Sequence, residues 1–234
     1  MPGDRLIRIL SKLRAQGDGQ SEAARLCEVC ADVLEMSGAG VMLMSGDVPR
    51  GSVCSSNDVS TLIEDLQYTL GEGPCIDSYL LEHPVFEPDL ADPAVPRWIA
   101  FTPPAVAAGA RAIFGFPLQV GSVRLGALNL YRDQPGPLTD DQHADALVVA
   151  GVAARSVLNM QAQAPPGTTV LDTEGGSDFR FVVHQASGMV SVQLGISVAE
   201  ALIRLRAHAF GDNRPLVEIA EDVVARRLRF TEVA

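Results

Sequence analysis

The spacing of apolar residues predicts helices at the start of the chain and strands soon after them. Over residues 5–36, aliphatic side chains recur every three or four positions, with one interruption at Gly17–Gly19. This is the period of amphipathic helices. Residues 39–45 and 51–55 are short β-rich runs on either side of a Gly46-Asp47 turn. We therefore expect two helical segments followed by a pair of strands.

The next segments continue the mixture of helices and strands. Asn57 or Asp58 can cap a helix that runs through Leu62, Ile63 and Leu66. Prolines in the β-rich stretch 84–90 are typical of an edge strand. The stretches 111–119 and 124–132 flank a glycine-containing turn and predict an antiparallel hairpin. Thr139 and Asp140 can cap a further helix over 142–160.

This order predicts an α+β fold with an antiparallel sheet and flanking helices. The chain has neither a strand–GxGxxG–helix unit nor a GxxxxGK[ST] loop, so a doubly wound nucleotide-binding fold is not expected. The composition of residues 164–178, rich in proline, glycine and threonine, is that of a linker. We therefore expect a first domain over 1–163, a linker over 164–178 and a second domain over 179–234.

Three short amphipathic helices are predicted in the second domain: one at about 180–194, one from 198 to an end at Gly211, and one capped by Asn213, with Pro215 in its first turn, that continues through Val224. Gly195 ends the first helix, and Ser197 with Glu200 forms a capping box for the second. On the first helix, the side opposite the apolar residues is small and polar. A glycine inside a helix costs about 1 kcal/mol relative to alanine, so Gly188 within this stripe suggests the close approach of another helix or of a ligand. An ordinary solvated face is the alternative.

Charge is distributed unevenly between the two domains. The formal net charge is −11, and residues 1–179 carry 11 Lys and Arg against 23 Asp and Glu, whereas residues 180–230 carry seven Arg against five acids. Only the C-terminal part could therefore meet a polyanion. The third helix, however, is acidic on its outer side. The chain begins with a charged amphipathic segment and has four cysteines without framework spacing, so a cytoplasmic location without membrane association is expected.

The cysteines and histidines give no catalytic or metal-binding constellation. Cys27 and Cys30 form a C-x-x-C pair that is either redox-active, half of a zinc site, or simply two small core residues of one helix. Cys75 lies just inside a predicted helix N-terminus, where the helix dipole favours a thiolate that could sense oxidants; a structural role is the alternative. We therefore expect no metal and no enzymatic activity.

A sensor pocket is a further hypothesis for the first domain. Aromatic and polar residues on the predicted strands and loops could line a cavity between sheet and helices, or could instead be packed core. The candidate pocket residues are Cys75, Trp98, Phe114, Phe116, Asn129 and Tyr131.

Two families resemble the chain at the level of motifs. The run HQASGMV, followed by LGISVAEAL and LVEIAEDVV, resembles the ANTAR domain, a three-helix RNA-binding module of bacterial antitermination regulators. The upstream runs LCEVCADVLEMSGAGVMLM, LGEGPCIDSY and RAIFGFPLQVGSVRLGALNLYR resemble a GAF sensor domain. The resemblance implies a GAF-type antiparallel sheet with flanking helices, followed by an all-α three-helix ANTAR bundle.

The resemblance also implies a function. It suggests a one-component transcription antitermination regulator whose GAF domain senses a signal and whose ANTAR domain binds paired hairpins in nascent RNA. A homodimer would meet the two hairpins, and a small-molecule effector of unknown identity would occupy the GAF domain, with no other cofactor. Combining the family with the polar stripe, we expect RNA contacts from Arg180, His184, Gln185, Ser187, Ser191 and Arg206. The alternative is a small-molecule or redox-sensing GAF protein whose C-terminal helices serve dimerisation or protein contacts.

Overall fold

The protein folds into two compact units, Met1–Glu174 and Gly175–Ala234. This computed structural model describes residues 7, 9–12, 21–46, 48–165, 168–173, 178–212 and 214–231. The side chains of 172, 173 and 178–181 lie outside the described part. We treat each unit by itself.

The N-terminal unit is built on a five-stranded antiparallel sheet with strand order β2-β1-β5-β4-β3. The predicted α+β class is thereby confirmed, and the short β3 lies at the sheet edge. The elements in chain order are α2 (Glu22–Leu34), β1 (Gly38–Ser45), β2 (Val48–Ser55), α3 (Asp58–Leu70), α4 (Pro74–Leu81), β3 (Val85–Glu87), α5 (Thr102–Ala107), β4 (Ala112–Val120), β5 (Val123–Arg132), α6 (Asp140–Gln163) and α7 (Val170–Thr173).

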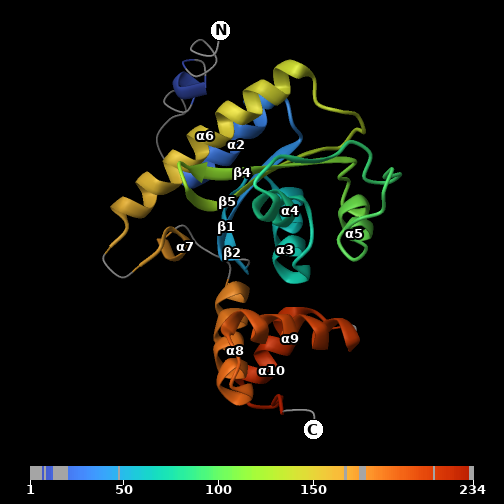
Figure 1. The fold of residues 1–234 in the computed structure, drawn as a ribbon, viewed down its shortest axis with the longest axis vertical. Helices are drawn as coiled ribbons and strands as arrows, with labels where there is room; N and C mark the ends of the chain where they lie inside the picture. Colours follow the sequence, from blue (N-terminus) through green and yellow to red (C-terminus); the bar gives the residue numbers. More distant parts are fainter. Residues whose placement is uncertain are drawn as a thin grey trace. The chain divides into compact units, whose positions relative to one another are not determined.

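Helices cover both faces of this sheet, with α2 and α6 on one side and α3, α4 and α5 on the other (Figure 1). Successive side chains of a strand point to opposite faces. Phe114 and Phe116 of β4 accordingly join the core formed with α2 and α6. Ile113 of β4 and Tyr131 of β5 join a second apolar cluster with α3 and α5. The sheet therefore separates two distinct cores.

Local sequence signals fix several of these element boundaries. The Asn57 side chain accepts a hydrogen bond from the backbone N–H of Ser60 and caps α3. Thr139 and Gln142 form a reciprocal capping box at the start of α6. Gly121, with a φ of +60°, supplies the left-handed turn between β4 and β5. The predicted caps and the predicted hairpin are confirmed.

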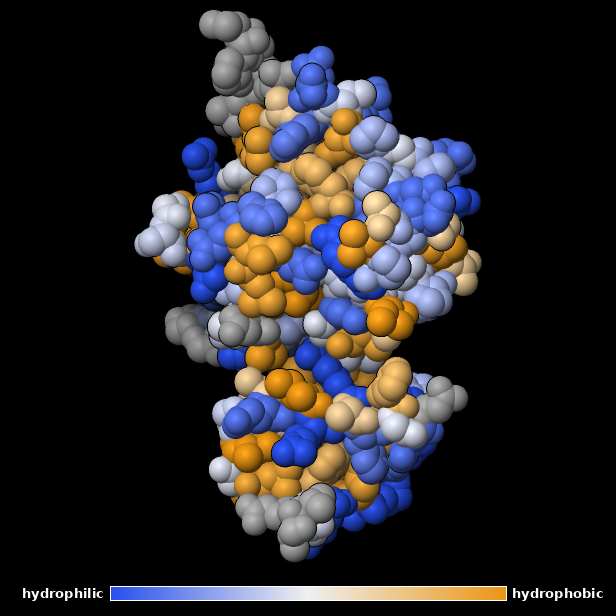
Figure 2. Space-filling view, turned by 45° about the vertical axis from the view of Figure 1, so that its right-hand side comes forward, coloured by the Kyte–Doolittle hydropathy of each residue, from blue (hydrophilic) through white to orange (hydrophobic). Residues whose placement is uncertain are grey.

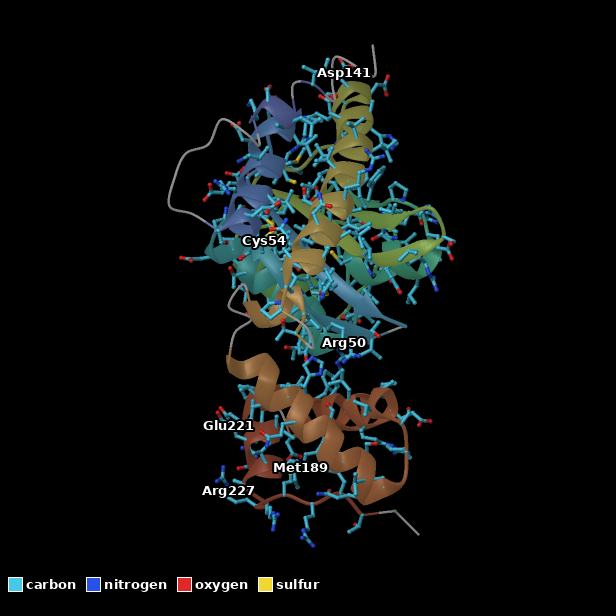
Figure 3. The ribbon with its side chains drawn as sticks, turned by 90° about the vertical axis from the view of Figure 1, so that its left-hand side faces the viewer. Arg50, Cys54, Asp141, Met189, Glu221 and Arg227 are labelled. Carbon is cyan, nitrogen blue, oxygen red and sulfur yellow. A yellow bond between two sulfur atoms is a disulfide. The ribbon has the colours of Figure 1, made fainter. Side chains whose placement is uncertain are left out.

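Cys27 and Cys30 are both buried core residues, as one of the predicted alternatives holds, but the disulfide of Cys27 was not predicted. Cys27 of α2 forms a disulfide with Cys54 of β2 and not a pair with Cys30 (Figure 3). Their Cα atoms are 5.9 Å apart because α2 packs against the β1–β2 pair. Cys30 is a free thiol buried in the same core. Spacing along the chain did not indicate this disulfide, since its partners are brought together only by the fold.

In its described residues the C-terminal unit has three helices, as predicted: α8 (Asp178–Leu194), α9 (Val198–Gly211) and α10 (Leu216–Val224). The predicted capping box is present, since the hydroxyl of Ser197 accepts from the N–H of Glu200 and the Glu200 carboxylate accepts from the N–H of Ser197. The core of the unit is aliphatic: Val183, Ala186, Val190, Ala201, Leu202, Leu205, Ala209, Leu216, Ile219, Ala220 and Val223.

None of the described helices alone has the length and apolar content of a membrane span. Only Val182–Leu194 taken together with Val198–Gly211, across a bend of 104°, reaches that measure, by length and composition.

Candidate RNA interface and sensor site

The buried face of α8 is rotated relative to the predicted one. Ser187, which we expected in the polar stripe, is only 1% exposed, and its hydroxyl donates to the carbonyl of Val183 at 2.8 Å. This bond to the preceding turn satisfies the hydroxyl inside the helix, so serine can take a core position there. The prediction that Ser187 contacts RNA is therefore wrong.

Ser191 has a structural contact as well. Its half-buried hydroxyl donates to the carbonyl of Ile196 at 2.6 Å and so fastens the turn between α8 and α9. The hydroxyl hydrogen of Ser191 is thus used within the unit, and its predicted RNA contact stays a prediction.

The remaining predicted residues of α8 have different exposures. Gln185 is exposed and His184 is half-buried. Arg180 lies in the helix, but its side chain is outside the described part of the structure. A Cβ added at Gly188 would meet no atom within 4 Å. Close packing within the described part of the unit therefore does not explain this glycine, and the surface beside it is open.

Helix α9 presents an exposed apolar stripe next to its basic residues. Ile203 and Phe210 are 59% and 76% exposed, with exposed Ala207 between them. Arg206, the predicted contact on this helix, is half-buried at the edge of the stripe, and Arg204 is exposed on the other side. Figure 2 shows such apolar and polar surface intermixed on the C-terminal unit. Stacking of splayed RNA bases and contacts to phosphate both need surfaces of this composition.

The acidic outer side of α10 is largely neutralised by arginines. Asp222 accepts from Arg214 at 2.8 Å and from Arg227 at 2.7 Å, and Arg214 also bonds Glu218 at 3.3 Å. The hydrogen bonds from Arg214 and then Arg227 lower the pKa of Asp222. Glu221 and Arg227 can be followed in Figure 3. These ion pairs reduce the electrostatic repulsion between the acidic side of α10 and a polyanion.

The chain after α10 folds back onto the unit. The backbone N–H of Phe230 donates to the Gln193 side chain at 2.9 Å, and the Phe230 ring lies 5.2 Å from that of His208. These contacts were not predicted from the sequence. These two contacts join residues that are far apart in the chain, so no local sequence pattern predicts them.

In the N-terminal unit the structure separates the predicted sensor residues into two sets. Phe114 and Phe116 are fully buried on the α2–α6 side of the sheet. The other four lie on the opposite side, with α3, α4 and α5: Cys75, Trp98, Asn129 and Tyr131. One pocket lined by all six residues is therefore excluded, because the sheet stands between the two sets.

Cys75 does not have the properties of a reactive thiolate. It is fully buried in the first turn of α4, and its backbone N–H donates to the Gln67 side chain at 2.7 Å. Burial, and secondarily the charge of Glu64, raises the pKa of the thiol well above its ordinary value. Desolvation thus outweighs the helix dipole. Burial therefore favours the structural alternative for Cys75 over the oxidant-sensing hypothesis.

Two acids near Cys75 hold the segment that carries Trp98. One carboxylate oxygen of Glu72 accepts from the backbone N–H groups of Ala100 and Phe101 at 2.6 and 2.8 Å. The indole N–H of Trp98 donates to Asp77 at 2.9 Å. Trp98 has a φ of +33°, which a bulky residue rarely adopts. These contacts therefore stabilise a strained backbone against α3 and α4.

A buried polar group beside this segment was missed by sequence reasoning. Glu64 and Gln67 of α3 are fully buried, and Asn129 of β5 is 3% exposed. The amide of Asn129 donates to the Glu64 carboxylate at 3.4 Å. The sequence signal for this group is the helical spacing of acid and amide residues in α3. Such a pattern predicts a solvent-exposed helix face, whereas the structure buries it.

Comparisons with known proteins agree with these two units. The model of the ANTAR domain matches residues 177–224. The GAF domain of a phosphoenolpyruvate-protein phosphotransferase from Coxiella burnetii has a TM-score of 0.52 and 13% identity, and the match covers 69% of this chain and 95% of that one. At this identity the likeness shows the fold alone. No curated protein matches the chain.

Two further solved structures are similar. The GAF domain of the Acinetobacter phosphoenolpyruvate-protein phosphotransferase has a TM-score of 0.49 at 13% identity, with 70% of this chain and 96% of that one covered. Free methionine-R-sulfoxide reductase from Neisseria meningitidis has a TM-score of 0.46 at 16% identity, covering 70% and 92%. The chain thus combines a GAF-fold unit with a C-terminal ANTAR domain.

Proposed function

We propose that the chain is a one-component antitermination regulator, in which the ANTAR domain binds paired RNA hairpins and the GAF-fold unit senses a signal. The observation that carries this proposal is the match of the ANTAR domain to residues 177–224, the segment that folds into α8, α9 and α10. We infer a regulatory and sensory role for these two units from that match.

The RNA contacts are assigned to the outer sides of α8 and α9. Gln185 and His184 of α8 and Arg206 of α9 remain from the sequence prediction, together with Arg180. Ile203 and Phe210 add an apolar surface on which loop bases can stack. The net charge of residues 180–230 is only +2, because seven arginines oppose five acids. Loop shape and stacking therefore carry more of the specificity than phosphate attraction does.

A homodimer and a small effector complete the proposal. Two ANTAR domains, one from each subunit, would meet the two hairpins of a transcript. The linker over 164–178 would pass the state of the sensor domain, 1–163, to the RNA-binding domain, 179–234. The protein would act in the cytoplasm, where nascent transcripts are available.

Crosslinking in cells tests this proposal. The full chain is crosslinked to RNA, and the retained transcripts are sequenced. We expect enrichment of leader regions that contain two neighbouring hairpins, in the wild type but not in an Arg206→Ala, Gln185→Ala variant. Enrichment of no RNA class above an unrelated acidic protein would contradict it.

The exposed apolar stripe of α9 favours one second candidate. Ile203, Ala207 and Phe210 form a surface of the kind that joins protein partners. On this reading the C-terminal helices serve dimerisation or protein contact, and the chain is a sensing protein without RNA. A Phe210→Ser variant that loses self-association while no RNA binds to the wild type would support this alternative.

A further inference from the structure

The two cysteines of the disulfide reach the same core by different local features. The buried residues of α2 recur at helical spacing, and Cys27 is one of them, with Cys30 one turn further along. Cys54 of β2 pairs with Val41 of β1, and both belong to the core that α2 and α6 cover. The register shifts next to this pair and leaves Val53 as an extra residue, also buried in that core. Such a bulge bends a strand and re-aims its side chains, so β2 is irregular where it carries Cys54.

The function that we propose gives this disulfide a particular meaning. A protein that binds nascent RNA works in a reducing compartment. Disulfides are rare there, and those that occur are mostly transient and redox-active. The bonded form of Cys27 and Cys54 is then one state of a redox pair, and the dithiol is the other.

The exposures of the cysteines in this core indicate which of them reacts first. Cys54 lies on an edge strand and is 8% exposed, whereas Cys27 is 0% exposed and Cys30 2%. Cys54 is therefore the most accessible to a reagent. Burial raises the pKa of the Cys30 thiol to about 12, so Cys30 stays protonated and does not compete for the bond.

The short helix α7 packs on the strand that carries Cys54. It lies against β2 and α6 (Figure 1), and its Val170 is 1% exposed in the same core as the disulfide. The Gln161 amide of α6 holds the start of α7, since Nε2 donates to the carbonyl of Thr168 at 3.1 Å and Oε1 accepts from the N–H of Val170 at 3.0 Å. Helix α7 is the last described helix before α8, so a change at β2 reaches the connecting segment through α7.

We propose that Cys27 and Cys54 form a reversible couple that responds to low-molecular-weight disulfides, and that the bonded state keeps α7 docked on β2. The inference rests on the proposed function, which supplies the reducing compartment, and it names the class of signal that the N-terminal unit senses.

The oxidation is a pair of thiol–disulfide exchanges. The Cys54 sulfur, as thiolate, forms a bond to one sulfur of the reagent, and the reagent disulfide breaks to release its first thiol, which takes the Cys54 proton. The Cys27 sulfur then bonds to the Cys54 sulfur, and the second reagent thiol leaves with the Cys27 proton. Two cysteine thiols are thereby oxidised, and one reagent disulfide is reduced to two thiols.

Reduction changes the space that the pair needs. Two unbonded sulfur atoms stay further apart than two bonded ones, so α2 and β2 must separate locally. Helix α2 contacts both β1 and α6, whereas β2 is an edge strand that pairs with β1 and has a bulge beside Cys54. We therefore expect β2 to move, and the docking of α7 on it to weaken.

Thiol counting tests the couple. The full chain is equilibrated with excess reduced glutathione or with excess glutathione disulfide, quenched with acid and alkylated in denaturant, and its intact mass gives the number of free thiols. We expect four in the first buffer and two in the second, because the disulfide takes two of the four cysteines. The matched control Cys30→Ala should keep this difference of two. Cys54→Ala should form no intramolecular disulfide in either buffer.

Hydrogen exchange tests the link to α7. The amide of Val170 should exchange at least about fivefold faster in the reduced chain than in the oxidised chain, because its bond to Gln161 opens more often. Cys30→Ala should show the same difference. A Cys27→Ala, Cys54→Ala double variant should give one exchange rate in both buffers. If the double variant does not fold, the wild type in the two buffers still decides the question.

Three results would overturn the inference. They are a disulfide that persists in excess reduced glutathione, as a structural bond does, four free thiols in both buffers, and equal Val170 exchange in the two states of the wild type. The affinity for a two-hairpin RNA is measured with both forms. RNA binding without a redox couple sinks the inference and leaves the proposed function intact, whereas a working couple without RNA binding contradicts the proposed function and leaves the couple established.

Discussion

At the scale of single residues, exposure on α8 decides which side chains can meet RNA. Gln185 and Ser187 are both polar and only two positions apart, yet the first is exposed and the second is buried with its hydroxyl bonded to Val183. Residue type alone could not separate them, because serine can satisfy itself within a helix whereas glutamine cannot. This pair provides a matched test.

Gln185→Ala should weaken RNA binding by about five- to tenfold, the effect of losing about 1 kcal/mol of hydrogen bonding. Ser187→Ala should leave the affinity within about twofold, because its side chain does not reach the surface. Filter binding with a two-hairpin RNA measures both. Equal losses in the two variants would show that the assigned face is wrong.

The buried thiol of Cys30 predicts a loss of stability in alkali. Burial raises its pKa from 9.0 to about 12, so between these values the unfolded chain releases a proton that the folded chain retains. This contribution to stability is complete below pH 9 and is lost as the pH rises. The free energy of unfolding should fall by about 1.4 kcal/mol per pH unit in that window.

Cys30→Ala removes the thiol and with it this pH-dependent contribution to the free energy of unfolding. Urea unfolding of the N-terminal unit at pH 8 and at pH 10 should show a smaller decrease for the variant than for the wild type. Parallel decreases in the two proteins would mean that the Cys30 thiol ionises in the folded state.

At the scale of elements, caps and turns could be predicted from local sequence, whereas the burial of polar helix faces could not. The caps at Asn57, Thr139 and Ser197 and the β4–β5 hairpin follow from residues close together in the chain. The orientations of α3 and α8 do not, since a hydrophobic pattern assigns polar residues to solvent. Helix α8 buries a serine hydroxyl that bonds within its own helix, and α3 buries polar groups against the sheet. The Cys27–Cys54 disulfide is a product of long-range packing.

The segment that carries Trp98 offers a test of a second non-local contact. Glu72→Ala removes the acceptor of two backbone N–H groups and should destabilise the N-terminal unit by about 1–3 kcal/mol. Glu72→Gln keeps an oxygen acceptor and should cost less. Urea unfolding gives both values, and an alanine variant as stable as the wild type would show that the segment does not depend on this carboxylate.

At the scale of the whole molecule, the charge division agrees with the division of labour that we propose. We propose that the acidic N-terminal part disfavours RNA and that RNA binds to α8 and α9 of the ANTAR domain, where arginine and exposed apolar side chains occur. A single domain of this kind offers a small contact area. In a dimer, the second domain would bind the same RNA molecule after the first has bound, and this would raise the overall affinity.

The most direct test of this account is the affinity of the full chain for three RNAs at one fixed salt concentration. The first carries two neighbouring hairpins, the second carries one of them, and the third carries both stems with altered loops. The account predicts that the two-hairpin RNA binds at least about tenfold more tightly than either of the others. Equal affinity for all three, or no binding to any, would contradict it.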